Sequence, residues 1–160
     1  MIQITVNVNG EDFDVDVMPE LTLLDLLREL GFHSVKKGCG EGDCGACGVI
    51  LDGIYCKSCL VLAMQADGRS VLTVESMGNV DEPHPLQKAF VDEGAVQCGY
   101  CIPSMLLAAD ALLSENEDPT DDEIKEALDG NLCRCTGYVK QINAVKKAAK
   151  VLREEENDNE

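Results

Sequence analysis

Basic residues, histidines and long apolar runs are all scarce in this sequence, and each shortage excludes a class of function. The 160 residues include 13 Lys and Arg against 30 Asp and Glu, a formal net charge of -17. Nucleic acid and anionic membranes would repel such a chain, so proteins are its expected partners. No apolar stretch approaches membrane-spanning length, and the first residues show neither a basic region with an apolar run nor a small-residue cleavage site. We therefore expect a cytoplasmic protein.

Groups typical of catalysis are also few. The two histidines, His33 and His84, lie in no recognisable nucleophile or metal motif, and we expect each at the surface or at a helix start. The many carboxylates between Asp110 and Asp129 are typical of solvated helix faces joined by an acidic loop. The sequence therefore predicts that substrate chemistry takes place on another chain.

Cysteine, in contrast, is abundant, with nine residues. Thiols in a reducing compartment seldom form disulfides, and the close spacing of these cysteines favours metal ligation instead. The odd number implies at least one spare thiol.

The pattern of apolar residues predicts an α+β protein that changes character near residue 80. Residues 2–18 alternate around an Asn-Gly turn, which predicts a β-hairpin. A helix follows, capped by Thr22 and Asp25, with a leucine stripe and an end at Gly31. Short apolar runs predict further strands at 49–51, 60–63 and 71–74, which gives a small mixed sheet with one helix.

Turn formers and prolines in residues 78–85 predict a linker, after which the apolar period becomes helical. The last residues, 154–160, are highly charged and are expected to form a solvated, frayed tail. We thus expect one domain at 1–77 and a helical domain at 86–153. The helices are predicted at about 86–93, 103–115, 121–129 and 138–153.

The first cysteine group lies in a glycine-rich loop, GCGEGDCGACG. Cys39, Cys44 and Cys47 have the spacing C-x4-C-x2-C, and Cys59 follows in a Ser-Cys-Leu motif. This is the spacing of plant-type 2Fe-2S ferredoxins, and glycines let the loop turn sharply and aim backbone N–H groups at sulfur. A zinc knot or simply buried thiols are the alternatives, although the gap between Cys39 and Cys44 lies at the loose end of zinc spacing.

The second cysteine group combines a C-x2-C pair, Cys98 and Cys101, with a C-x-C pair, Cys133 and Cys135. Each pair lies at the end of a predicted helix. On spacing alone this group could bind either a cluster or zinc, because four cysteines on converging helices suit both.

The residues around these cysteines resemble a known family, the small two-cluster iron-sulfur subunits of the molybdenum hydroxylases. That group includes xanthine dehydrogenase, aerobic carbon monoxide dehydrogenase, nicotinate dehydrogenase and 4-hydroxybenzoyl-CoA reductase. Several independent motifs recur in the family's order over nearly the whole chain, to about residue 150, which argues against a chance match. The matching stretches are KKGCGEGDCGACGVILDG, KSCLVLA, HPLQKAF, GAVQCGYCIPSM and GNLCRCTGY.

The resemblance implies a β-grasp, plant-type ferredoxin-like domain followed by a four-helix-bundle domain, each holding one 2Fe-2S cluster. It implies a large partner chain with molybdenum on a pterin cofactor and a medium chain with FAD, as in xanthine dehydrogenase. Gln97 and Cys135 would lie where this chain meets the pterin. Electrons would pass from molybdenum through the helical-domain cluster and then the ferredoxin-domain cluster to FAD or another acceptor. The implied ligands are Cys39, Cys44, Cys47 and Cys59 for the first cluster and Cys98, Cys101, Cys133 and Cys135 for the second.

Two residues depart from the usual family pattern. Gly48 stands where many relatives have threonine, and Cys56 adds a thiol that forms a rival C-x2-C pair with Cys59. For Cys56 we favour a small, partly buried strand position without a ligand role.

Two other functions remain alternatives. A free-standing ferredoxin-type carrier would benefit from an acidic surface that steers it toward basic patches. A zinc-stabilised interaction module would also use clustered thiols. The apolar, weakly charged segment GAVQCGYCIPSM instead favours a fixed partner.

Overall fold

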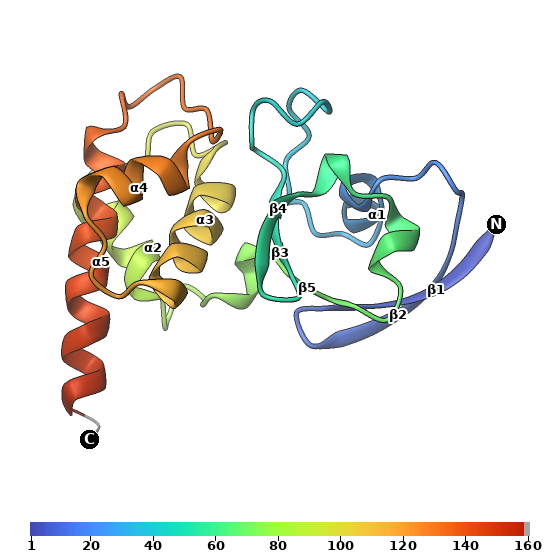
Figure 1. Cartoon of the computed structure of the whole chain (residues 1–160), viewed down its shortest axis with the longest axis horizontal. Coiled ribbons are helices and arrows are strands. Elements are labelled where there is room, and N and C mark those ends of the chain that lie inside the picture. Colours follow the sequence, from blue (N-terminus) through green and yellow to red (C-terminus); the bar gives the residue numbers. More distant parts are fainter. Residues whose placement is uncertain (159–160) are drawn as a thin grey trace.

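The computed structural model describes residues 1–158, which form a sheet lobe and a helical lobe side by side (Figure 1). The sheet has the strand order β2-β1-β5-β3-β4, with β1 and β5 parallel and the other neighbours antiparallel. This is the mixed β-grasp sheet that was expected. Its elements are β1 (Ile2–Val8), β2 (Glu11–Val17), α1 (Leu23–Glu29), β3 (Gly48–Leu51), β4 (Ile54–Lys57) and β5 (Ser70–Leu72).

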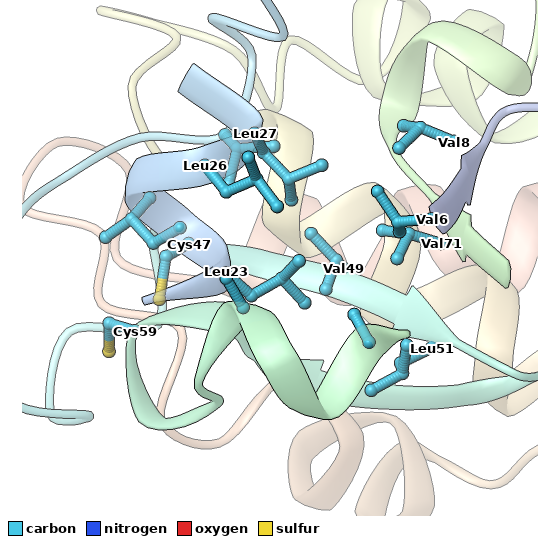
Figure 2. Packing of buried hydrophobic residues seen from close by; sticks show 14 of the residues in the cluster. Val6, Val8, Leu23, Leu26, Leu27, Cys47, Val49, Leu51, Cys59 and Val71 are labelled. Atoms are coloured by element: carbon cyan, nitrogen blue, oxygen red, sulfur yellow. The ribbon is translucent and has the colours of Figure 1, made fainter. Parts of the chain in front are cut away.

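The sheet lobe is built around α1 and the inner face of the strands. The Thr22 side chain caps α1 by accepting a hydrogen bond from the Asp25 N–H, as predicted. The leucines of α1 then pack against valines of β1, β3 and β5 (Figure 2). Burying one such side chain contributes about 1.5–3 kcal/mol, so this packing holds the helix on the sheet.

The sequence prediction was wrong for the connection before β5. Residues 60–63 do not form a strand: 3₁₀ turns occupy Ser58–Leu60 and Ala63–Ala66, and Leu62 makes a single bridge to Thr22. Only Ala63 of this run is buried, whereas Leu60 is 65% exposed and Leu62 is 38% exposed. Ala63 and Ala66 of the second turn pack into the core of the sheet lobe. The sequence analysis did not predict the strand β4. Its residues show no alternation of buried and exposed side chains, and its first residue, Ile54, is 69% exposed.

The helical lobe contains α2 (Pro85–Asp92), α3 (Ile102–Glu115), α4 (Asp121–Leu128) and α5 (Val139–Asp158). The predicted capping box of α4 is present, with Thr120 and Glu123 bonded to each other's backbone N–H. The prediction of a frayed tail was wrong for residues 154–158, which continue α5. A Lys150–Glu154 ion pair and a bond from Asn157 to the Arg153 carbonyl accompany this extension. Residues 159–160 lie outside the described part of the chain.

A second hydrophobic core fills the helical lobe and reaches the sheet lobe. Its fully buried members come from all four helices and include Phe90, Met105, Ile124 and Val145. Tyr55 of β4 packs against this core, so the two lobes share an apolar contact. No helix within residues 1–158 is long and apolar enough to cross a membrane.

Candidate metal centres

The first cysteine group lies at one end of the sheet lobe. Cys39 and Cys44 are in the loop between α1 and β3, Cys47 directly precedes β3, and Cys59 lies in the 3₁₀ turn after β4. Cys47 and Cys59 are buried, whereas Cys39 is exposed. The structure thus brings together residues that are up to twenty positions apart in the sequence.

Backbone N–H groups of this loop point at sulfur. The N–H groups of Glu41 and Cys44 each lie 3.4 Å from the Cys39 Sγ, and the Cys39 N–H lies 3.4 Å from the Cys44 Sγ. The bonds that the Cys39 sulfur accepts from the backbone N–H groups of Cys44 and then Glu41 lower the pKa of Cys39 to about 6. A loop that stabilises thiolate in this way suits an anionic iron-sulfur cluster.

Glycine is required in this loop for space as well as for conformation. A Cβ at Gly38 would lie 2.6 Å from the Cys44 Sγ, and one at Gly42, where φ is +86°, would lie 2.7 Å from Leu60. A side chain at Gly38 would enter the space of the Cys44 thiol, and one at Gly42 would have to displace the Leu60 side chain. The chemistry and the shape of the loop therefore both fit a cluster.

The second cysteine group lies where the helices begin and end. Cys98 and Cys101 immediately precede α3, and Cys133 and Cys135 lie between α4 and α5. Burial raises the pKa of Cys101 to about 12, and the neighbouring Cys133 adds to this rise. Burial also raises the pKa of Cys133, but bonds from Thr136 and from backbone N–H groups lower it overall.

The thiols of each group approach one another two by two. The Cys98 and Cys135 sulfurs are 3.6 Å apart, close to the distance of about 3.8 Å for two sulfurs bound at about 2.3 Å to one tetrahedral metal. Among residues 1–158, no three His, Cys, Asp or Glu side chains surround one common metal position. Side-chain contacts between thiols likewise pair Cys39 with Cys44, Cys47 with Cys59 and Cys101 with Cys133.

A buried polar network connects the two groups. The Ser104 hydroxyl of α3 donates to the Gly45 carbonyl, accepts from the Gly48 N–H at 3.1 Å and lies 2.8 Å from the Tyr55 hydroxyl. Next to it, the Leu132 N–H donates to the Cys44 carbonyl at 2.9 Å. The loop of the first cysteine group is therefore hydrogen-bonded to the residue that precedes Cys133.

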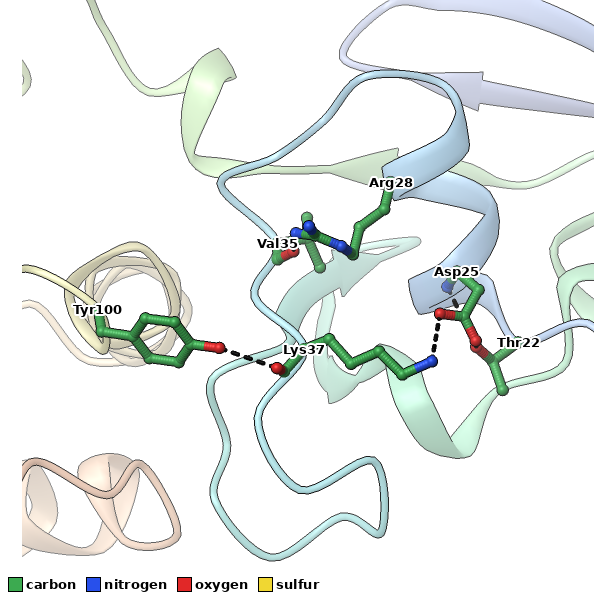
Figure 3. A network of polar contacts seen from close by, with 6 residues as sticks. All are labelled: Thr22, Asp25, Arg28, Val35, Lys37 and Tyr100. Carbon is green, nitrogen blue, oxygen red and sulfur yellow. Dashed lines mark hydrogen bonds and ion pairs between the residues drawn. The ribbon is translucent and has the colours of Figure 1, made fainter.

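A second set of contacts fixes the start of the glycine-rich loop (Figure 3). Lys37 forms an ion pair with Asp25 at 2.7 Å, and its hydrogen bond is the main cause of the lowered pKa of Asp25. The Tyr100 hydroxyl donates to the Lys37 carbonyl at 2.9 Å, and Arg28 donates to the Val35 carbonyl at 2.8 Å. Tyr100 lies between Cys98 and Cys101 in sequence order, so this bond again joins the two cysteine groups.

Gln97 and Cys56 occupy contrasting positions. Gln97 is exposed and directly precedes Cys98, whose sulfur lies 3.6 Å from that of the exposed Cys135. Cys56 lies on β4 opposite Val49 and packs partly buried against the first core. Burial raises the pKa of the Cys56 thiol.

Comparison with known proteins identifies both parts of the chain as iron-sulfur domains. Residues 6–75 match a family described as a 2Fe-2S iron-sulfur cluster binding domain, and residues 73–146 match a 2Fe-2S binding domain. The nicotinate dehydrogenase small FeS subunit of Eubacterium barkeri is 52% identical over 92% of this chain and 94% of its own length. The xanthine dehydrogenase iron-sulfur-binding subunit of Escherichia coli O157:H7 is 44% identical over 90% and 92%. This chain belongs to the small iron-sulfur subunits of the molybdenum hydroxylases.

Solved structures agree with this membership. A chain of quinoline 2-oxidoreductase from Pseudomonas putida 86 is 40% identical, with a TM-score of 0.90 and 96% of both chains covered. The aldehyde oxidoreductase of Desulfovibrio desulfuricans is 43% identical with a TM-score of 0.93, and here 97% of this chain corresponds to 18% of a much longer one. The subunit therefore carries two 2Fe-2S clusters and serves electron transfer in an oxidoreductase whose catalysis is carried on partner subunits. Neither the free-standing carrier nor the zinc module is favoured.

The sequence prediction missed several residues around the thiols of the subunit. Ser104 and Tyr55 of the connecting network were not singled out, and neither were Thr136 and Gln141 beside Cys133. Gln141 did leave a signal, because it stands one helical turn before Ala144 and Val145 on the face of α5 that is buried. A polar residue in an apolar stripe indicates a buried partner.

Proposed function

We propose that the four thiol pairs hold the four irons of two clusters. Cys39, Cys44, Cys47 and Cys59 would bind the first cluster, and Cys98, Cys101, Cys133 and Cys135 the second. The observation that carries this assignment is the pairing itself, because each iron of a 2Fe-2S cluster needs two thiolates beside its bridging sulfides. When bound, each cluster can accept and release one electron. The spare thiol, Cys56, is directed to the sheet core and has no ligand role.

The exposed surface around Gln97 and Cys135 is the proposed entry side for electrons. A side-chain amide both donates and accepts hydrogen bonds, so an exposed Gln97 suits the edge of a pterin ring on a large molybdenum subunit. From there the chain offers a short route, since Cys133 follows Leu132, whose N–H is bonded to the Cys44 carbonyl at 2.9 Å. The exposed loop of Cys39 and Cys44 would face a medium FAD subunit.

The proposed ligand sets also determine the domain organisation of the chain. We place a ferredoxin-like domain at 1–77, a linker at 78–85 and the helical domain at 86–153, each domain with one cluster. We propose a cytoplasmic location for the assembly, which the abundance of cysteine supports because thiols persist in reducing compartments. The substrate of the assembly is set by the molybdenum subunit, and the relatives range from nicotinate to xanthine and aldehyde enzymes.

Metal content tests the cluster assignment directly. The purified subunit should contain about four irons and four acid-labile sulfides per chain, with two distinguishable EPR signals after reduction. A count near two irons would contradict the two-cluster assignment. Colourless protein with bound zinc would contradict iron-sulfur binding altogether.

The direction of electron flow needs the assembled complex. Gln97→Ala should slow the reduction of both clusters by substrate while the iron content stays unchanged. Gln3→Ala, which changes an exposed glutamine on β1, is the matched control and should have no effect. Wild-type reduction rates in the Gln97 variant would show that electrons enter elsewhere.

A further inference from the structure

Gln141 is a buried polar side chain whose presence is not explained by any gain in folding stability. It lies on α5, its residue is 0% exposed, and it is surrounded by the apolar core of the helical lobe. Its Oε1 has no hydrogen-bond partner among the residues that the structure describes. A buried, unpaired carbonyl oxygen opposes folding, so an apolar residue of similar size would be expected here if packing alone mattered.

The orientation of the Gln141 amide is set by its neighbours. Its Nε2 lies 3.4 Å from the Ala95 carbonyl oxygen, which can only accept a hydrogen bond. The amide nitrogen, not the oxygen, therefore faces this side. The same nitrogen is bonded to the Thr136 Oγ1 and lies 3.8 Å from the Cys133 Sγ.

This orientation determines where the Thr136 proton points. Because an amide NH₂ can only donate, the Thr136 oxygen must accept from Gln141. The Thr136 Oγ1 lies 3.0 Å from the Cys133 Sγ. A metal-bound thiolate can only accept, so the single hydroxyl proton is directed at sulfur.

We propose that Gln141 is a positioning residue that orients the Thr136 hydroxyl toward the Cys133 sulfur and thereby raises the reduction potential of the second cluster. The inference rests on the proposed role of Cys133 as a ligand. Two donors in series polarise each other, and a donor aimed at a ligand sulfur stabilises the negative charge that the cluster gains on reduction. The site is buried on the Gln141 side, so water does not compensate for a lost donor.

The test is a redox titration of the loaded subunit, with each cluster followed by its own EPR signal. Gln141→Met keeps the length and removes the donor, and Thr136→Val keeps the shape and removes the hydroxyl. Each should lower the midpoint potential of the second cluster and leave the first unchanged. A tenfold fall in the equilibrium constant for reduction of the cluster would appear as a decrease of about 59 mV in the midpoint potential of this one-electron couple. Thr136→Ser, which keeps the hydroxyl, should have the wild-type potential. Gln3→Met, which makes the same change at an exposed glutamine on β1, is the control and should leave both potentials unchanged.

A double variant tests whether Gln141 acts through the Thr136 hydroxyl, as a relay, or whether the two residues affect the potential independently. If Gln141 acts through Thr136, Gln141→Met should shift the potential far less when valine already stands at position 136. Additive shifts, an unchanged potential with full iron content, or equal shifts of both clusters would overturn the relay. Loss of the second cluster's signal is expected for Cys133→Ser, and its retention would refute the ligand assignment instead.

A measurement on the unmodified protein covers the case in which a variant does not load its clusters. ENDOR spectra of the reduced second cluster should show a strongly coupled proton that exchanges in deuterium oxide, from the Thr136 hydroxyl. Absence of such a proton in the wild type would contradict the inference without any variant.

Discussion

Gly45→Ala should push the two cysteine loops apart. A Cβ at this position would lie 2.1 Å from the Gly130 carbonyl oxygen and 2.9 Å from the Asn131 Cα, both backbone atoms of the neighbouring loop. An ordinary carbon–oxygen contact is about 3.3 Å or longer, so the loops must separate by about 1 Å. The bond from the Leu132 N–H to the Cys44 carbonyl, now 2.9 Å, would then be lost.

The size of the effect follows from two contributions. Gly45 has a φ of +70°, and alanine in this left-handed region costs about 1–2 kcal/mol. Loss of the Leu132 bond and of the Ser104 bond to the Gly45 carbonyl adds about 1 kcal/mol each. A total of about 3–4 kcal/mol corresponds to a fall in unfolding temperature of about 6–16 °C for a chain of this size.

The assay is thermal unfolding of the cluster-loaded subunit by circular dichroism at one fixed scan rate. Gly53→Ala is the matched control, because Gly53 has a φ of +83° with nothing within 4 Å of its added Cβ. It should show the conformational cost alone. If Gly45→Ala is no more destabilising than Gly53→Ala, the close contact between the loops does not hold the lobes together.

Three further predictions concern single side chains. Cys59→Ser should abolish the EPR signal of the first cluster and halve the iron content, whereas Cys56→Ser should keep both. The opposite result would make Cys56 the fourth ligand and Cys59 the spare thiol. Tyr100→Phe should lower the unfolding temperature by about 2–4 °C through loss of one bond worth about 1 kcal/mol, and an unchanged temperature would show that the bond to Lys37 contributes nothing. Burial raises the pKa of Asp110 despite the opposing effect of His84. Folding therefore carries a free-energy cost for the charged carboxylate above that pKa. Asp110→Asn should raise the unfolding temperature near pH 8, and the gain should shrink as the pH falls. A gain that grows toward acid pH would contradict this sign.

Local signals in the sequence predicted most of the fold. The Asn9-Gly10 turn, the Thr22 cap and the Thr120–Glu123 capping box each act within a few residues, so each could be identified from the sequence. The connection around Leu60–Ala63 could not, because an apolar run does not show by itself whether its side chains are buried, and here Leu60 and Leu62 are exposed. The extension of α5 beyond residue 153 was missed because composition alone does not show that Arg153 reaches Asp118 across the lobe.

The cysteines were easier to identify than the residues around them. The spacing of the first group indicates a plant-type cluster, whereas the second group needed the residues around its cysteines to distinguish a cluster from zinc. Ser104 and Tyr55 carry no such pattern, because a serine on a helix and a tyrosine on a strand acquire their role only when the lobes meet. Thr136 and Gln141 are close in sequence to Cys133, but their order as successive donors depends on the carbonyl of the distant Ala95.

The missing side chain at position 48 has a consequence for how this subunit can change over evolutionary time. A Cβ at Gly48 would lie 2.2 Å from the Ser104 Oγ and 2.4 Å from the Tyr55 hydroxyl. Ser104 and Tyr55 therefore both occupy the volume that a side chain at position 48 would need. A lineage that gains a side chain at position 48 must first, or simultaneously, make room at both positions 55 and 104, so the three positions are coupled.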